Sequence, residues 1–196
     1  NGWNHLYFID KSGVERQITT GNYDINVVYQ INEADKVVYF QAPVSGPEHL
    51  NISAYHWETH QLNVLSPAHG KASATFVTPY HYIERYSADT VRKQVSIVSI
   101  QQQTKNMLLD DRRAEDSILQ PKIYFRLPVE GDSLHAYAIF PPNFDSTQSY
   151  PVLFNVYGGP GAQEVVNIWP GKAELWLQYV AQLGYIVVCA DNRGTP

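Results

Sequence analysis

The chain has 196 residues, of which 44% are hydrophobic and 17% charged, a composition that allows one large or two small packed cores. Its formal net charge is −5, and its 14 lysines and arginines are scattered along the sequence, which argues against a nucleic-acid partner. No apolar run approaches the roughly 18 residues that a membrane-spanning helix needs, so we expect no transmembrane segment in this chain.

Short strand patterns separated by turn residues fill the first 120 residues. We expect a first group of four strands at residues 3–9, 14–19, 23–31 and 36–42. A second group is expected at 49–57, 62–65, 74–77 and 82–86, and a third begins at 94–100 and 106–109. Aligning Leu65 with Leu109 gives an offset of 44 residues, which is typical of four-stranded β-propeller blades. Because a closed propeller needs about four to eight blades, we expect the chain to be the interior of a longer polypeptide.

A cluster of charged residues at positions 110–116 interrupts the strand pattern, and we interpret it as a solvated linker. We therefore divide the chain into propeller blades over residues 1–120 and a second domain over residues 121–196. The second domain opens with a hairpin of two strands, predicted at residues 122–127 and 134–140.

The remaining residues predict a strand at 151–157, a glycine-rich loop, a helix at 172–183 and a strand at 185–190. Both strands are apolar throughout and are expected to be buried on both faces. The helix carries five apolar side chains at helical spacing, namely Leu175, Trp176, Tyr179, Val180 and Leu183. A hairpin followed by such a crossover is typical of the first strands and helix of an α/β-hydrolase domain.

The loop Tyr157-Gly158-Gly159-Pro160-Gly161 carries the clearest chemical signal. In α/β-hydrolases the turn after the third strand supplies a backbone N–H to the oxyanion, and glycine lets the backbone approach the reacting carbonyl. Gly158 and Gly159 are the candidates for this backbone role. The chain contains no Gly-x-Ser-x-Gly motif, so the nucleophile that would use such a loop is absent from it.

The blades, the linker, the Tyr157 loop and the segment Asp191-Asn192-Arg193-Gly194-Thr195 together resemble the prolyl oligopeptidase family of serine peptidases, and most closely its dipeptidyl peptidase IV branch. The resemblance implies that the Tyr157 hydroxyl donates a hydrogen bond to the oxyanion. It implies a parent enzyme that releases dipeptides from peptide N-termini after Pro or Ala. The catalytic Ser, Asp and His and the acidic pair that anchors the substrate amine would lie outside this chain, so the chain alone is expected to be inactive.

The resemblance further implies peptide substrates, a homodimeric parent protein, and export or a periplasmic location. It implies no cofactor and no metal. Two alternatives stay open. One is another branch of the family, an oligopeptidase or an acylaminoacyl peptidase, which an upstream acidic pair that anchors a free amino terminus would distinguish. The other is a non-enzymatic propeller scaffold whose hydrolase domain has decayed.

The positions of the other candidate residues favour structural roles over chemical ones. His56 and His60 flank an expected hairpin turn, where the helical face of a metal-binding His-x-x-x-His motif is missing. Ser133 and His135 are expected on one face of a strand rather than paired as nucleophile and base. Cys189 lies in an apolar strand and is expected to be inert. The segment 191–194 follows a buried strand and is expected to be a structural loop rather than a source of catalytic groups.

Overall fold

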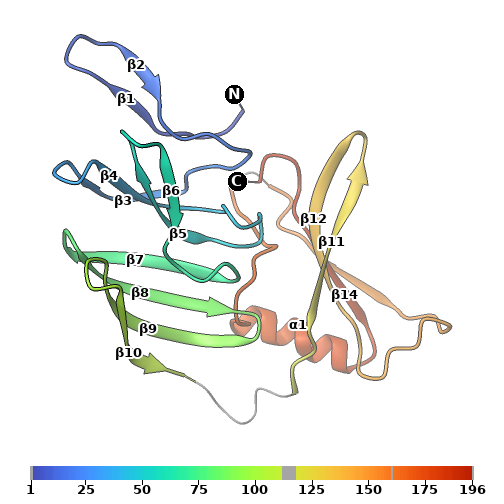
Figure 1. Ribbon diagram of the computed structural model, residues 1–196. Helices are drawn as coiled ribbons and strands as arrows, with labels where there is room; N and C mark the ends of the chain where they lie inside the picture. Colours follow the sequence, from blue (N-terminus) through green and yellow to red (C-terminus); the bar gives the residue numbers. More distant parts are fainter. Residues whose placement is uncertain (1, 112–117, 160, 196) are drawn as a thin grey trace. The chain divides into compact units, whose positions relative to one another are not determined.

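The structure is a computed structural model that describes residues 2–111, 118–159 and 161–195 (Figure 1). Most of the expected linker at 110–116 lies outside the described residues. Backbone contacts divide the chain into two compact units. The first comprises Asn1–Ala88 and Lys93–Asp110, and the second comprises Asp89–Arg92 and Asp111–Pro196.

The first unit is built from β-strands, and no helix occurs in its described residues. Its strands are β1 (Tyr7–Ile9), β2 (Glu15–Gln17), β3 (Val27–Asn32), β4 (Val37–Ala42), β5 (Asn51–His56), β6 (Gln61–Val64), β7 (Lys71–Thr78), β8 (His81–Ala88), β9 (Val91–Ser99) and β10 (Thr104–Asp110). They form a two-stranded sheet β1-β2 and two four-stranded sheets, β3-β4-β5-β6 and β10-β9-β8-β7. The multi-sheet, nearly all-β character expected for this region is confirmed.

The expected grouping of strands into sheets is wrong by two strands. The sequence divides the groups between residues 42 and 49, yet β4 and β5 pair within one sheet, with Ala42 opposite Asn51. A turn signal marks where a strand ends but not whether the next strand joins the same sheet, because pairing depends on contacts beyond the turn. The period itself is confirmed, since β3 begins at Val27 and β7 at Lys71, 44 residues later.

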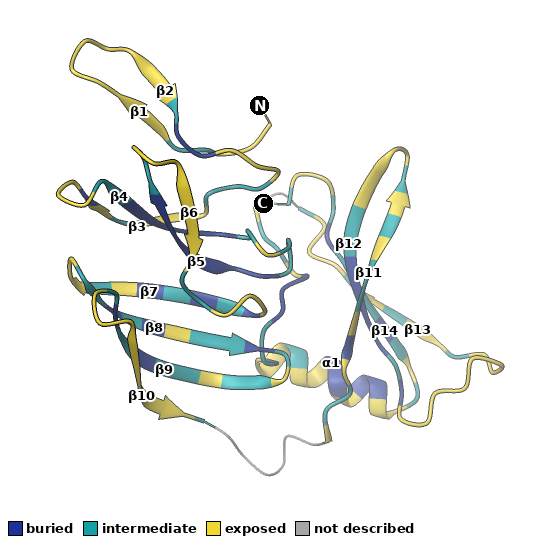
Figure 2. Cartoon of the chain, in the orientation of Figure 1, coloured by how far each residue is buried: buried dark blue, intermediate teal, exposed yellow. Residues whose placement is uncertain are grey.

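The sheets of the first unit pack on one another through two apolar cores (Figure 2). Phe40 and its neighbours on β4 contact Ile18 and Tyr55 on one side. On the other side, Ile52 of β5 and Tyr82 of β8 join a core shared by the two four-stranded sheets. The sheet β3–β6 is therefore covered on both faces, and β4 is buried along nearly its whole length.

The second unit has a four-stranded mixed sheet and one helix. Its elements are β11 (Lys122–Val129), β12 (Asp132–Ile139), β13 (Val152–Asn155), α1 (Lys172–Gln182) and β14 (Ile186–Ala190). The sheet order is β11-β12-β14-β13, in which β13 and β14 run parallel and the other neighbours run antiparallel. The helix connects the two parallel strands, as the sequence predicts.

Helix α1 covers one face of this sheet (Figure 1). Leu177, Val180 and Ala181 pack against Val187 and Cys189 of β14. Of the five apolar side chains that the sequence places at helical spacing, only Val180 is buried, whereas Leu175, Trp176, Tyr179 and Leu183 are exposed. The helix is apolar on two sides, so its periodicity does not identify which side the sheet covers. No helix of the described residues is both long enough and apolar enough to cross a membrane.

Strand β13 is exposed along the sheet edge, contrary to the expectation that it is buried on both faces. Its burial alternates between exposed and half-buried, and Phe154 is 67% exposed. The reason is its position: β14 pairs with one side of β13, and no strand of the described residues pairs with the other. Strand β14 also alternates, with Val187 and Cys189 buried beneath the helix and Val188 only half-buried.

Candidate functional site

The loop that follows β13 has the backbone conformation that its glycines predict. Gly158 and Gly161 have φ angles of +70° and +83°, which residues other than glycine rarely adopt. At Gly159 the constraint is space, because a Cβ there would lie 3.0 Å from Cε1 of the Tyr157 ring. Glycine therefore lets the tyrosine ring lie close to the loop backbone.

Tyr157 itself lies at the start of this loop and is 56% exposed. No hydrogen bond to its hydroxyl is found within the described parts of the chain. A phenol is a neutral donor at pH 7, and only two side-chain torsions separate it from the backbone. The group is thus accessible to an external acceptor, as an oxyanion donor must be.

The loop begins where β13 pairs with β14. Asn155, the last residue of β13, lies opposite Cys189, and its side-chain amide donates to the Cys189 Sγ at 3.8 Å. Burial raises the pKa of the Cys189 thiol to about 11. This thiol is fully buried in the apolar cluster beneath α1, so the expectation of an inert cysteine agrees with its position.

The segment beyond the loop is held by Asp191, the first residue after β14. Its carboxylate accepts the backbone N–H of Glu164 at 2.8 Å and that of Val165 at 3.2 and 3.3 Å. Its own N–H donates to the carbonyl of His135 at 2.9 Å. Sequence reasoning placed Asp191 in a structural loop but missed these partners; an aspartate directly after a buried strand is the only local signal.

Arg193 folds back onto the β11–β12 turn. Its guanidinium donates to the Val129 carbonyl at 3.1 Å and to Glu130 at 3.2 Å, and it also binds Asp132. All three side chains are more than half exposed, so these ion pairs contribute little to stability. Both charged residues of the segment 191–194 therefore bind groups of the second unit itself.

The other sequence candidates are not assembled into a site. His60 has a φ of 58° in the turn after β5, and its Nδ1 lies 2.9 Å from the Tyr55 hydroxyl. The Nδ1 of His56 accepts the backbone N–H groups of Glu58 and Thr59. Within residues 2–111, 118–159 and 161–195, no three His, Cys, Asp or Glu side chains are grouped to hold a metal ion.

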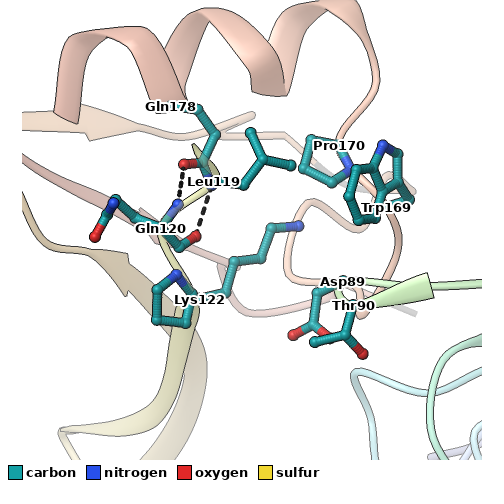
Figure 3. A pocket seen from close by; sticks show the side chains of 9 residues that line it. Asp89, Thr90, Leu119, Gln120, Lys122, Trp169, Pro170 and Gln178 are labelled. Carbon is teal, nitrogen blue, oxygen red and sulfur yellow. Dashed lines mark hydrogen bonds between the residues drawn. The ribbon is translucent and has the colours of Figure 1, made fainter. Parts of the chain in front are cut away.

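A separate cavity of about 290 Å³ lies within the second unit, lined in part by Leu119, Lys122 and Trp169 (Figure 3). Figure 3 shows the Lys122 ammonium group pointing into it. That ammonium pairs with Glu174 at 2.5 Å. Gln178 exchanges two hydrogen bonds of 2.9 Å with the backbone of Gln120, drawn as dashed lines. The Lys122, Gln120 and Gln178 groups thus pair with one another or with Glu174, and these bonds hold α1 beside the start of β11.

Comparisons with known proteins agree with these features. The family model described as the dipeptidyl peptidase IV (DPP IV) N-terminal region matches residues 1–92. The chain is 31% identical to dipeptidyl peptidase 4 of Arthroderma otae and 30% identical to a probable dipeptidyl peptidase 4 of Aspergillus flavus. Each alignment covers the whole of this chain and 27% of the relative, so the chain spans about a quarter of the length of these proteins.

Solved structures of similar fold carry related names. The crystal structure of Porphyromonas gingivalis dipeptidyl peptidase 4 matches with a TM-score of 0.87 and 28% identity, over 100% of this chain and 28% of that one. A putative dipeptidyl aminopeptidase IV from Bacteroides ovatus matches with a TM-score of 0.78 and 26% identity, over 98% of this chain and 29% of that one. By sequence and by fold, the chain is similar to a segment of dipeptidyl peptidase 4 proteins, and its residues 1–92 match their N-terminal region.

Proposed function

We propose that the chain is part of a serine exopeptidase that releases Xaa-Pro or Xaa-Ala dipeptides from peptide N-termini, and that Tyr157 stabilises the oxyanion. The observation that carries this proposal is an exposed tyrosine whose hydroxyl has no hydrogen-bond partner among the described residues, at the head of a glycine loop that follows a parallel strand. The relatives named dipeptidyl peptidase 4 support the same activity for the parent protein.

The proposed roles follow the two domains that the sequence predicts. Residues 1–120 would supply propeller blades that restrict access to short or unfolded peptides. Residues 121–196 would supply the first strands and helix of an α/β-hydrolase domain. The antiparallel pair β11–β12, followed by the parallel pair β13–β14 with α1 between them, supports this assignment.

The chemistry assigned to Tyr157 is a hydrogen bond that strengthens during the reaction. A serine hydroxyl, activated by histidine, adds to the substrate carbonyl, and the carbonyl oxygen becomes an oxyanion. The Tyr157 hydroxyl donates to that oxygen, and the backbone at Gly158 and Gly159 lines the same space. Because the negative charge develops only in the transition state, the hydrogen bond lowers the barrier more than it favours substrate binding.

The serine, aspartate and histidine of the triad are not among the motifs of this chain, which has no Gly-x-Ser-x-Gly. The isolated chain is therefore expected to be inactive, and the test requires the full-length parent. Substrates with free and with acylated N-termini separate the candidate branches. A dipeptidyl peptidase needs the free amine, whereas an acylaminoacyl peptidase accepts the blocked one.

The test replaces Tyr157 with Phe in the full-length parent, which keeps the ring and removes only the donor. We expect kcat for an alanyl-prolyl chromogenic substrate to fall by about 10²–10³-fold with little change in KM. Tyr179→Phe is the matched control, because Tyr179 is 57% exposed on α1 and lies outside the loop. Near-normal turnover by Tyr157→Phe would show that Tyr157 has no role in the oxyanion hole.

A further inference from the structure

The glycine loop is anchored at its start by β14 and at its far end by Asp191, the residue that follows β14. At its start, Asn155 of β13 lies opposite Cys189 of β14. At its far end, the backbone N–H groups of Glu164 and Val165 donate to the Asp191 carboxylate. Asp191 lies two residues beyond Cys189 in the chain. The described residues between these anchors, 156–159 and 161–163, include two glycines in the left-handed region, where the backbone has little intrinsic preference to hold one shape.

The far anchor depends on one carboxylate. Asp191 is only 7% exposed, and no lysine or arginine of the described residues pairs with it. Burial raises the pKa of this carboxyl, while the hydrogen bonds from Glu164 and Val165 and the nearby His135 lower it. The buried charge is thus compensated mainly by backbone groups of the segment that it holds.

The burial of the Val165 side chain is a second restraint on the segment that Asp191 binds. Its side chain is buried in the apolar cluster with Leu177 and Val187, so the segment is held by packing on one side and by Asp191 on the other. Two N–H groups point at the carboxylate, and both of its oxygens accept. The Val165 N–H is shared between the two oxygens, so an asparagine would place an NH₂ group against it at the Oδ2 position and lose that half of the shared hydrogen bond.

We propose that Asp191 is a positioning residue for the oxyanion loop: by binding Glu164 and Val165 it holds the loop in the shape that aims the Tyr157 hydroxyl. This inference rests on the proposed function of Tyr157. Misplacing a catalytic group by about 1 Å costs up to about 10²-fold in rate, so an anchor several residues away has a measurable effect on turnover.

A double-mutant cycle in the full-length parent tests the proposal. We compare the wild type, Asp191→Asn, Tyr157→Phe and the double variant on the same alanyl-prolyl substrate. We expect Asp191→Asn to lower kcat by about 10-fold or more while KM changes by less than about 2-fold. In the Tyr157→Phe background, Asp191→Asn should lower kcat by less than about 3-fold, because the hydroxyl that Asp191 positions is already absent.

Asp145→Asn is the matched control within the second unit. Asp145 accepts the backbone N–H of Thr147 at 3.0 Å in the loop before β13, and within the described residues its hydrogen bonds stay in that loop. We expect its kcat to match the wild type. If Asp191→Asn does not fold, Asp191→Glu retains the charge, displaces it by one methylene, and enters the same cycle.

Three outcomes would overturn the proposal. Equal losses of kcat in both backgrounds would mean that Asp191 acts independently of Tyr157. An unchanged kcat for folded Asp191→Asn and Asp191→Glu would mean that the loop keeps its shape without this anchor. An unchanged kcat for Tyr157→Phe alone would remove the proposed function itself and, with it, the role assigned to Asp191. The single and double variants therefore separate the two failures.

Discussion

The two units differ in how completely their sheets are covered. In the first unit, the sheet β3–β6 has an apolar core on each face, and β4 is buried almost throughout. In the second, α1 covers one face of the sheet, while Phe154 and Val152 of β13 are exposed. Where neighbouring sheets of the first unit cover one another, we expect the strands to serve mainly stability. The partly open second unit carries the glycine loop beside an exposed strand, and our proposals assign the position of Tyr157 there to a few specific anchors.

The largest expected difference between the two units is in the loss of stability caused by two Phe→Ala substitutions, one in each unit. Phe40 is fully buried on β4, and its replacement should lower the free energy of unfolding by about 3–5 kcal/mol. Phe154 is 67% exposed on β13, and its replacement by alanine should change the free energy of unfolding by less than about 0.5 kcal/mol. Urea unfolding of the purified 196-residue chain, followed by tryptophan fluorescence, measures both. Equal destabilisation would contradict the difference in coverage.

A smaller effect, the pH dependence of stability caused by the Cys189 thiol, tests whether water is excluded from the sheet face that α1 covers. Burial raises the pKa of the Cys189 thiol from about 9 in an exposed thiol to about 11 in the folded state. Between these values the unfolded chain has lost the thiol proton and the folded chain has kept it. The contribution to stability is therefore complete below about pH 9 and is lost as pH rises toward 11, by roughly 2–3 kcal/mol.

Cys189→Ala is the control for this titration, because it removes the thiol and keeps every tyrosine, including Tyr137, whose pKa is raised mainly by burial and in part by Cys189. The free energy of unfolding should fall more steeply with pH in the wild type than in Cys189→Ala between about pH 9 and 11. Parallel slopes would mean that water reaches the thiol beneath α1.

Local features were predictable from the sequence, and pairings between distant segments were not. The helix at 172–183 and the hairpin at 122–140 appear close to their expected bounds because periodicity and turn residues are local signals. The grouping of strands into blades and the exposure of β13 depend on which strands pair, and no local pattern encodes this.

The candidate site divides in the same way. Its glycine loop is visible as a motif, because left-handed φ angles and close approach to the Tyr157 ring both require glycine. The hydrogen bonds from Glu164 and Val165 to Asp191 join residues about 26 positions apart in the sequence, so only the folded structure reveals them.

The oxyanion role of Tyr157 is tested most directly by a crystal structure of the full-length parent bound to a boronic acid or aldehyde analogue of a dipeptide substrate. Such a compound forms a tetrahedral adduct with the catalytic serine and places an oxygen where the oxyanion develops. We expect the Tyr157 hydroxyl at about 2.5–3.0 Å from that oxygen, within normal O–H···O distance. A Tyr157 hydroxyl more than about 3.5 Å from the oxygen, or turned away from it, would contradict the assignment.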